Sequence, residues 1–216
     1  MKAPFALAQF FWPWLERLTA EEAKNRTDRK STDEARIAGL NLRRDTEVAL
    51  EEARRIADSE AERRRGTDQK AATYLPLVAA LIPLILTVVS ALGEKKVGSA
   101  PIWLNMLLLG LAVAYTASAG LWAFKVLEVS ISYEPGLGDF ELSWKKPRPA
   151  QALALRLLLH TRRNQDGINW KVSCIKMAHA FLLRAFLTFS LLLILNIGWY
   201  LAGMLPTISL PSLGEC

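Results

Sequence analysis

Residues 67–96 read TDQKAATYLPLVAALIPLILTVVSALGEKK. Between Lys70 and Glu94 this stretch holds 23 consecutive residues without a formal charge. The hydrocarbon core of a bilayer is about 30 Å thick, and a helix that rises about 1.5 Å per residue crosses it in about 20 apolar residues. The stretch is therefore long enough to span a membrane, whereas a buried helix of a soluble protein rarely needs more than about 14 such residues.

The rest of the chain separates charged from apolar residues in the same way. Residues 21–65 carry 24 charged side chains, whereas the windows 97–124 and 185–214, of 28 and 30 residues, carry none. The sequence thus predicts an all-α membrane protein with three transmembrane helices over residues 71–93, 97–124 and 185–206. The alternative is a soluble all-helical core with unusually apolar helices.

Two prolines, Pro76 and Pro83, lie inside the first predicted span. A proline in the middle of a helix in water costs about 3 kcal/mol, but membrane-spanning helices tolerate proline because neighbouring helices and local adjustments satisfy the freed carbonyl groups. The two prolines are seven residues apart, so they lie on nearly the same face of a helix. We therefore keep the span and expect a kink near Pro83.

Basic residues set the predicted orientation. Fifteen Lys and Arg lie within residues 1–70 and ten within 125–184, whereas the link between the first two spans has two and the region after 184 has none. The positive-inside rule thus places residues 1–70 and 125–184 in the cytoplasm, and the link and an external tail, 207–216, on the outer side of the membrane. A cleaved signal peptide is the alternative at the N-terminus, but it would export the basic region.

The cytoplasmic N-terminal region is predicted in two parts. Residues 1–18 form an aromatic segment suited to the lipid headgroup interface or to packing on the protein. Residues 19–70 form a charged helical region that starts with a capping box of Thr19 and Glu22 and can divide at Gly39. Small apolar residues give this region a weak coiled-coil or bundle seam, and the alternative is a solvated charged helix with one packing face. The seam consists of Ala35, Ala38, Leu42, Ala49, Ala53 and Ile56.

Residues 125–184 are predicted as a second cytoplasmic segment. Alternation of apolar and polar residues around a Glu-Pro-Gly turn signal indicates a short β-hairpin over 130–144. A helix over 150–163 follows. After a loop, a long helix begins at 168, runs through 184 and continues into the third span.

No motif for catalysis, metal binding or cofactor binding is present. The two histidines, His160 and His179, stand alone on apolar helices, and the P-loop, the nucleophile elbow and the HExxH zinc pattern are missing. The predicted spans contain no Asp, Glu, Lys, Arg or His, which disfavours proton-coupled transport. Attraction of basic residues to anionic lipid headgroups explains the net charge of +6 without nucleic acid. We therefore expect neither an enzyme nor a nucleic-acid-binding protein, and no cofactor.

Small residues recur at helix-packing intervals in the second and third spans. Such residues let helices approach closely in a bilayer. They either pack the three helices of one chain or also join chains in a homo-oligomer, and the sequence leaves both open. One stripe consists of Gly110, Ala114 and Ser118, another of Ala112, Thr116 and Gly120, and a third of Gly198 and Ala202.

Two runs of sequence resemble membrane proteins of bacterial conflict systems. The first, EEARRIADSEAERRRGTDQKAATYL over 51–75, has Arg and then Asp-x-Lys-Ala before a span. The second, HTRRNQDGINWKVSCIKMAHAFLLRAFL over 160–187, has Asn, Asn and Lys before another span. Both are similar to the SLATT-type and cyclic-nucleotide-associated transmembrane effectors. The matching positions are Arg63 or Arg64, Asp68, Lys70, Ala71, Asn164, Asn169 and Lys171.

The resemblance implies an oligomeric inner-membrane effector of antiviral defence that, once triggered, perturbs the membrane of an infected cell. If the first and third spans are neighbours, the polar residues of the two runs are expected to form a switch network that holds the cytoplasmic helices in one of two arrangements. The alternative function is a membrane scaffold or accessory subunit that recruits a cytoplasmic protein partner through its charged N-terminal helix.

Overall fold

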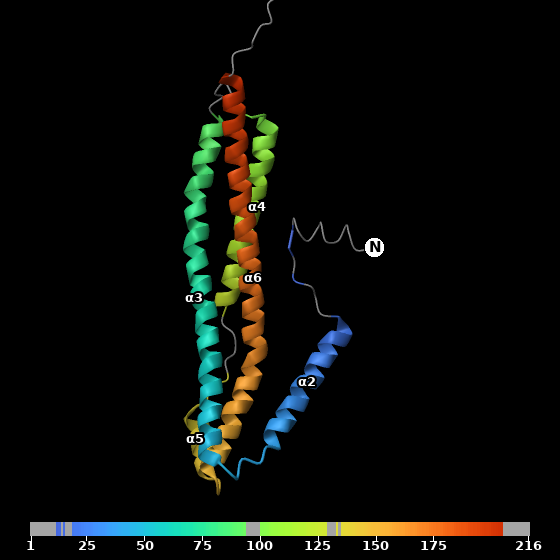
Figure 1. Cartoon of the computed structure of the whole chain (residues 1–216), viewed down its shortest axis with the longest axis vertical. Coiled ribbons are helices and arrows are strands. Elements are labelled where there is room, and N and C mark those ends of the chain that lie inside the picture. The colour runs from blue at the N-terminus through green and yellow to red at the C-terminus, as the bar shows by residue number, and fades with distance from the viewer. Residues whose placement is uncertain are drawn as a thin grey trace, which may run out of the picture. The chain divides into compact units, whose positions relative to one another are not determined.

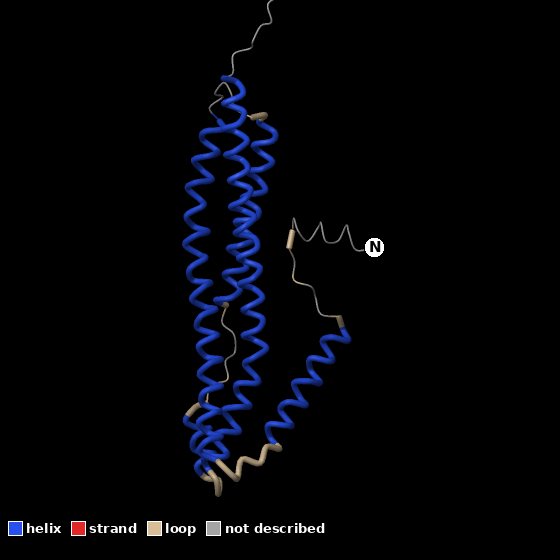
Figure 2. The backbone as a smooth tube through the Cα atoms, viewed as in Figure 1, coloured by secondary structure: helices blue, strands red, loops and turns tan. Residues whose placement is uncertain are grey.

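The computed structural model describes residues 12, 13, 15, 19–93, 100–128, 133 and 135–204. Three of its helices are long and apolar enough to cross a membrane. The prediction of an all-helical chain with three long apolar helices is therefore confirmed. Every regular element in the described residues is a helix (Figure 1, Figure 2): α2 (Ala20–Ala38), α3 (Thr46–Gly93), α4 (Ile102–Leu127), α5 (Leu137–Trp144) and α6 (Pro149–Met204).

Parts of the prediction fall on residues that the structure does not describe. These are most of the aromatic segment 1–18, the link over 94–99 and the predicted tail 207–216. The predicted placement of these segments at the membrane stays a prediction.

The capping box predicted at the start of the charged region is present. The Thr19 backbone N–H donates to Glu22 Oε2 over 2.8 Å, and the Glu22 N–H donates to Thr19 Oγ1 over 3.2 Å. These bonds satisfy two amides at the start of α2. The helix ends at Gly39, whose N–H donates to the Ala35 carbonyl over 3.0 Å. Because α3 begins only at Thr46, the division at Gly39 is confirmed, and the apolar seam does not run along one helix.

α3 stays one helix through both of its prolines. An α-helix loses a backbone hydrogen bond at each proline, because the ring nitrogen carries no hydrogen. Pro76 and Pro83 are both exposed, and the Thr87 hydroxyl donates to the Pro83 carbonyl over 2.9 Å. The prolines thus interrupt the hydrogen bonds of α3 without ending it, and the kink expected near Pro83 stays a prediction.

The hairpin predicted over 130–144 is wrong where the structure describes it, since residues 137–144 form helix α5. The turn signal starts a helix because the Asp139 carboxylate accepts the Gly136 N–H over 3.2 Å and so caps the first turn. The alternation that suggested a strand also places Phe140 and Trp144 one helical turn apart. Residues 129–132 and 134 lie outside the described part of the chain.

Residues 149–204 form a single helix, α6, so the helix predicted over 150–163, the loop after it and the helix predicted from 168 are one element. The loop prediction rested on Asn164, Asp166 and Gly167, which are weak helix formers. In the structure the first two use their side chains in contacts with other segments, and Gly167 is exposed. Contacts elsewhere in α6 thus outweigh a helix-propensity cost of about 1 kcal/mol at the glycine.

The helices pack in two compact units. Unit 1 consists of Met1–Leu75 and Leu121–Ala178, and unit 2 of Pro76–Gly120 and His179–Cys216. The long helices α3, α4 and α6 contribute residues to both units. One apolar cluster of unit 1 combines these three helices through Ala71, Val126, Cys174 and Ile175.

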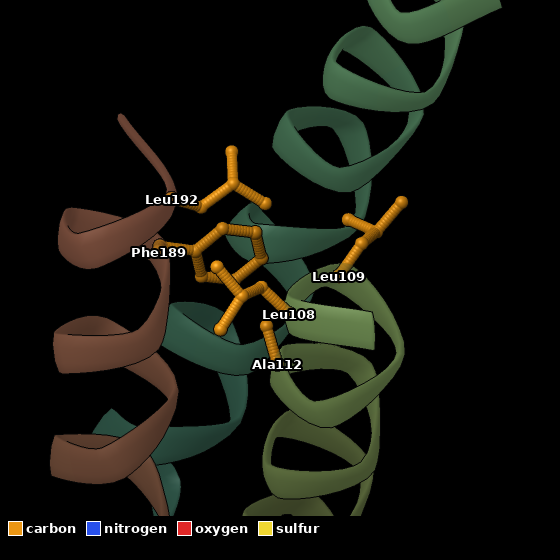
Figure 3. Packing of buried hydrophobic residues seen from close by; sticks show 5 residues of the cluster. All are labelled: Leu108, Leu109, Ala112, Phe189 and Leu192. Atoms are coloured by element: carbon orange, nitrogen blue, oxygen red, sulfur yellow. The ribbon is translucent and has the colours of Figure 1, made fainter. Parts of the chain in front are cut away.

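Unit 2 has a narrow apolar core. Figure 3 shows Phe189 and Leu192 of α6 lying against Leu108 and Ala112 of α4. Leu109 completes the cluster, and partly buried leucine, isoleucine and valine side chains of α3 pack against it. In the most apolar window of α3 no residue is buried, and in those of α4 and α6 only 44% and 28% of residues are. Most of the apolar surface of these helices is therefore not covered by the residues that the structure describes.

A pair of asparagines joins α4 to α6 inside unit 2. Asn196 Nδ2 donates to Asn105 Oδ1 over 2.8 Å, and Asn105 Nδ2 lies 3.3 Å from Asn196 Oδ1. Asn105 is 1% exposed and also donates to the Ala100 carbonyl. Amide pairs of this kind contribute about 0.6 to 2 kcal/mol each between helices in a membrane.

Candidate functional site

Two members of the predicted switch network, Asp68 and Lys171, form an ion pair. Lys171 Nζ donates to Asp68 Oδ1 over 2.7 Å and joins α6 to α3 within unit 1. The Lys171 side chain is 7% exposed, whereas that of Asp68 is 35% exposed. A buried ammonium group is costly unless it is paired, so the position of Lys171 depends on the Asp68 carboxylate.

Two further contacts use residues of the same predicted set. Arg63 donates to Asn169 Oδ1 over 2.9 Å, which adds a second polar link between α3 and α6. Asn164 accepts the Tyr133 N–H over 2.8 Å and donates to the Tyr133 carbonyl over 2.7 Å. One side-chain amide thus satisfies both backbone groups of a residue in the connection between α4 and α5.

The predicted set forms at least three contacts among the described residues. The contacts of Asp68, Arg63 and Asn164 are separate from one another. Lys70 is exposed, while Arg64 is half-buried and lines a cavity beside Asp68. The structure therefore brings most of these side chains to the contact between α3 and α6, and their switching role stays a prediction.

The cavity, of ≈ 450 Å³, lies between α3 and α6 within unit 1. The cavity is open at Ala57 and Ala61 because their side chains are small. Its polar wall includes Arg65, Asp68 and Asn164. Two buried wall atoms, Glu60 Oε2 and His160 Nδ1, have no hydrogen-bond partner among the described residues. Pockets that bind small molecules have volumes of roughly 300–1,000 Å³, so this cavity is large enough for one. Its wall carries both positive and negative side chains, however, and therefore does not indicate which class of ligand would bind.

α5 is attached to α6 through Asp139, a contact that the sequence did not reveal. The Asp139 carboxylate pairs with Arg156 and lies 3.6 Å from His160 Nε2. The Gly136 N–H, with the nearby His160 and Arg156, lowers the pKa of Asp139 below its usual value. The Gly-x-x-Asp spacing is a helix-start signal, but the hairpin interpretation hid it.

α2 is held to α6 by ion pairs and buries none of its own residues. Exposed ion pairs contribute about 0 to 1 kcal/mol each and weaken as salt is added. No local sequence signal links these partners, because they are more than a hundred residues apart. The pairs are Arg26 with Asp166, Asp33 with Arg162 and Glu34 with Arg163, at N–O distances of 2.9, 2.8 and 3.3 Å.

The two small-residue stripes of α4 have different surroundings in unit 2. Ala112, Thr116 and Gly120 are buried, and a Cβ added at Gly120 would lie 3.3 Å from Val78 Cγ1 of α3. A Cβ added at Gly110 would meet nothing within 4 Å. The stripe of Ala112, Thr116 and Gly120 therefore packs helices within the chain, and we call it the inner stripe. The stripe of Gly110, Ala114 and Ser118 is more exposed, and we call it the open stripe. Of the open positions, Gly110, Gly198 and Ala202 are exposed, and Ala114 and Ser118 are half-buried.

No protein-family model, curated protein or solved structure matches the chain. The resemblance to conflict-system effectors thus stays an expectation from sequence. Within the described residues, no group of three or more His, Cys, Asp or Glu side chains is placed to hold a metal ion.

Gly120→Leu should destabilise the packing of unit 2, because its side chain would overlap Val78. Overpacking of this kind costs about 1–3 kcal/mol. The unfolding temperature of the chain in detergent, followed by circular dichroism, should fall for Gly120→Leu. It should stay near the wild-type value for the matched change Gly110→Leu. Equal effects of the two changes would contradict the assignment of an inner and an open stripe.

Asp68→Lys and Lys171→Glu should each destabilise unit 1, by about 1–3 kcal/mol, because each leaves a charge of the pair without its partner. The double variant should recover most of the loss, since it restores opposite charges. The free energy of unfolding of the four proteins measures the coupling. Additive losses would mean that the 2.7 Å contact contributes no pairwise stabilisation.

Proposed function

We propose that the chain is a bacterial inner-membrane protein with three spanning helices, and that it acts as an oligomeric, membrane-perturbing effector of a defence system. The observation that carries the membrane assignment is the apolar surface of unit 2. Its helices bury a thin strip and leave large apolar side chains outward, as at Leu86, Leu107 and Ile194. Monomeric soluble proteins rarely expose apolar surface on this scale, whereas lipid covers it.

The orientation in this proposal follows the distribution of charge. Unit 1 carries the ion pairs and nearly all the basic residues, which supports a cytoplasmic position. Near the end of α4, Lys125 Nζ lies 4.3 Å from the centroid of the Trp122 ring. Aromatic and basic side chains together are typical of the lipid headgroup region, so this pair supports a membrane boundary there.

Self-association is supported by the open stripe of α4. The inner stripe already packs against α3, so the neighbouring small residues are not all required within one chain. Gly110 offers a shallow surface that a helix of a second chain can approach closely. The effector role itself rests on the sequence resemblance, and the contacts of Asp68 and Lys171 supply an element that a trigger could rearrange.

Overproduction of the chain in bacteria should collapse the membrane potential, measured with a potential-sensitive dye. Gly110→Leu should remove most of this effect, because the added side chain keeps a second chain away, whereas Gly110→Ala should preserve it. Val113→Leu, an exposed position of α4 outside the stripe, is the control for added bulk. All variants are compared at equal amounts in the membrane fraction.

Two results would contradict the proposal. An unchanged potential with abundant wild-type protein in the membrane would remove the effector role. Equal depolarisation by Gly110→Leu and wild type would remove self-association through the open stripe.

A membrane scaffold is the second candidate function, and α2 favours it. This charged helix buries none of its residues and is attached by ion pairs, so most of its surface is available to another protein. A scaffold would leave the membrane potential unchanged and would retain a cytoplasmic partner through residues 20–65. Charge reversal on the exposed side chains of α2 should then release that partner.

A further inference from the structure

Helix α5 turns its polar side toward α6 and its apolar side outward. Asp139 pairs with Arg156 of α6, and Ser143, one turn later, is 2% exposed. By contrast, Leu137 and Trp144 are 91% and 66% exposed. A surface helix normally buries its apolar side, whereas α5 leaves large apolar side chains as well as Glu141 exposed to water.

The outward residues form one continuous surface. Leu137, Phe140 and Trp144 follow each other at intervals of three and four residues, which places them on one face of the helix. The rings of Phe140 and Trp144 stack with their centroids 5.3 Å apart. We call these three side chains the α5 face. Because the rings support each other, the α5 face is ordered before anything binds it, which lowers the entropy cost of binding.

A group of basic side chains, called here the basic border, lies next to the end of α5 at Trp144. Arg43, Lys146 and Arg148 line one cavity of ≈ 450 Å³ that has no carboxylate in its wall. None of the three forms an ion pair within the described residues, whereas Lys145 is paired with Glu141 over 2.6 Å. The cavity joins the link before α3 to the start of α6, and Figure 1 shows α5 at this end of unit 1. The border of the α5 face is therefore positively charged.

We propose that the α5 face and its basic border bind an acidic segment of another protein, with large apolar side chains that cover Phe140 and Trp144. Aromatic side chains provide most of the affinity at protein interfaces, and charge complementarity provides orientation and specificity. An acidic partner fits because Arg43, Lys146 and Arg148 have no ion-pair partner among the residues that the structure describes.

Charge argues against a second copy of this chain as the partner. A two-fold contact of α5 with α5 would bring the basic borders of two copies together, and the chain as a whole carries a net charge of +6. The acidic residues Glu51 and Glu52 of α3 are already paired with Arg54 and Arg55. The inference does not depend on the self-association proposed above.

Distance argues against a lipid surface. Asp139 of α5 pairs with Arg156 of α6, and from Arg156 to Ala178, where unit 1 ends, α6 has 23 residues, roughly 35 Å of helix. The apolar residues proposed to enter the bilayer begin beyond that length. The combination of aromatic and basic residues also suits anionic lipid, so vesicles form one arm of the test.

The probe is a fluorescent acidic peptide in which Leu and Phe recur at helical spacing among Asp and Glu. Its binding to the full chain in nanodiscs of zwitterionic lipid is measured by fluorescence anisotropy. Trp144→Ala should weaken binding about 30-fold, as loss of an aromatic hot spot does. Lys146→Glu with Arg148→Glu should weaken binding about tenfold and remove most of its dependence on salt. Phe140→Ala is a second, independent change in the α5 face.

Matched controls separate the α5 face from the general positive charge of the chain. Lys24→Glu with Arg29→Glu, two exposed positions of α2, should leave the affinity within about twofold of wild type. A peptide of the same composition with its apolar residues scattered should bind at least about tenfold more weakly. Circular dichroism establishes that each variant keeps its helix content.

Three results would overturn the proposal. These are no binding of the acidic peptide, equal binding by the Trp144→Ala, Phe140→Ala and wild-type chains, and equal binding of the scattered peptide. Flotation with vesicles of anionic lipid that is lost on Trp144→Ala, without binding of the peptide, would assign the α5 face to a lipid surface instead. None of these results bears on depolarisation, so failure here is distinguishable from failure of the proposed function.

Discussion

The apolar segments of α3, α4 and α6 have too few partners among the described residues to be covered by them. The core of unit 2 is a strip in which Leu108, Ala112, Phe189 and Leu192 meet, and the outward faces of all three helices stay apolar. In lipid there is no hydrophobic drive to bring helices together, so close packing and hydrogen bonds have to do so. The Asn105 and Asn196 pair and the tight approach of Gly120 to Val78 are the contacts that fit this requirement.

Unit 1, unlike unit 2, is held together largely by polar contacts. Its helices carry much charge, and polar contacts join them across long sequence separations. The contacts differ in strength: Lys171 is buried against Asp68, whereas α2 has only partly exposed pairs and no buried residue. Release of α2 is therefore much less costly than separation of α3 from α6. Of the helices in unit 1, α2 is therefore attached more weakly than α3 and α6 are to each other.

The sequence was most informative where the physics is local or averaged over many residues. Windows without charge predicted the three long apolar helices, and Thr19 with Glu22 predicted the start of α2. The sequence-based prediction was wrong where a contact between residues far apart in the chain determines the secondary structure. Asp139 caps α5 and binds Arg156, so a segment with alternating residues became a helix, and contacts of Asn164 and Asp166 kept α6 continuous through a weak stretch.

The candidate site shows the same limit. The resemblance directed attention to Asp68, Asn164, Asn169 and Lys171, and the structure places all four at contacts of α3 or α6. The sequence could not assign their partners, because Arg63 meets Asn169 and Asn164 meets the Tyr133 backbone only after the helices pack. The ion pairs of α2 and the outward apolar side of α5 had no sequence signal, since both depend on which face of a helix meets α6.

The central claim is that lipid surrounds the apolar segments, and reactivity of single cysteines with a water-soluble maleimide tests it most directly. Leu86→Cys and Leu137→Cys are compared in a Cys216→Ser background, with the buried Cys174 retained. Leu86 and Leu137 are 61% and 91% exposed in the fold. In isolated open membranes the account predicts rapid labelling at position 137 and almost none at position 86. Rapid labelling at both, with the chain in the aqueous supernatant, would contradict it.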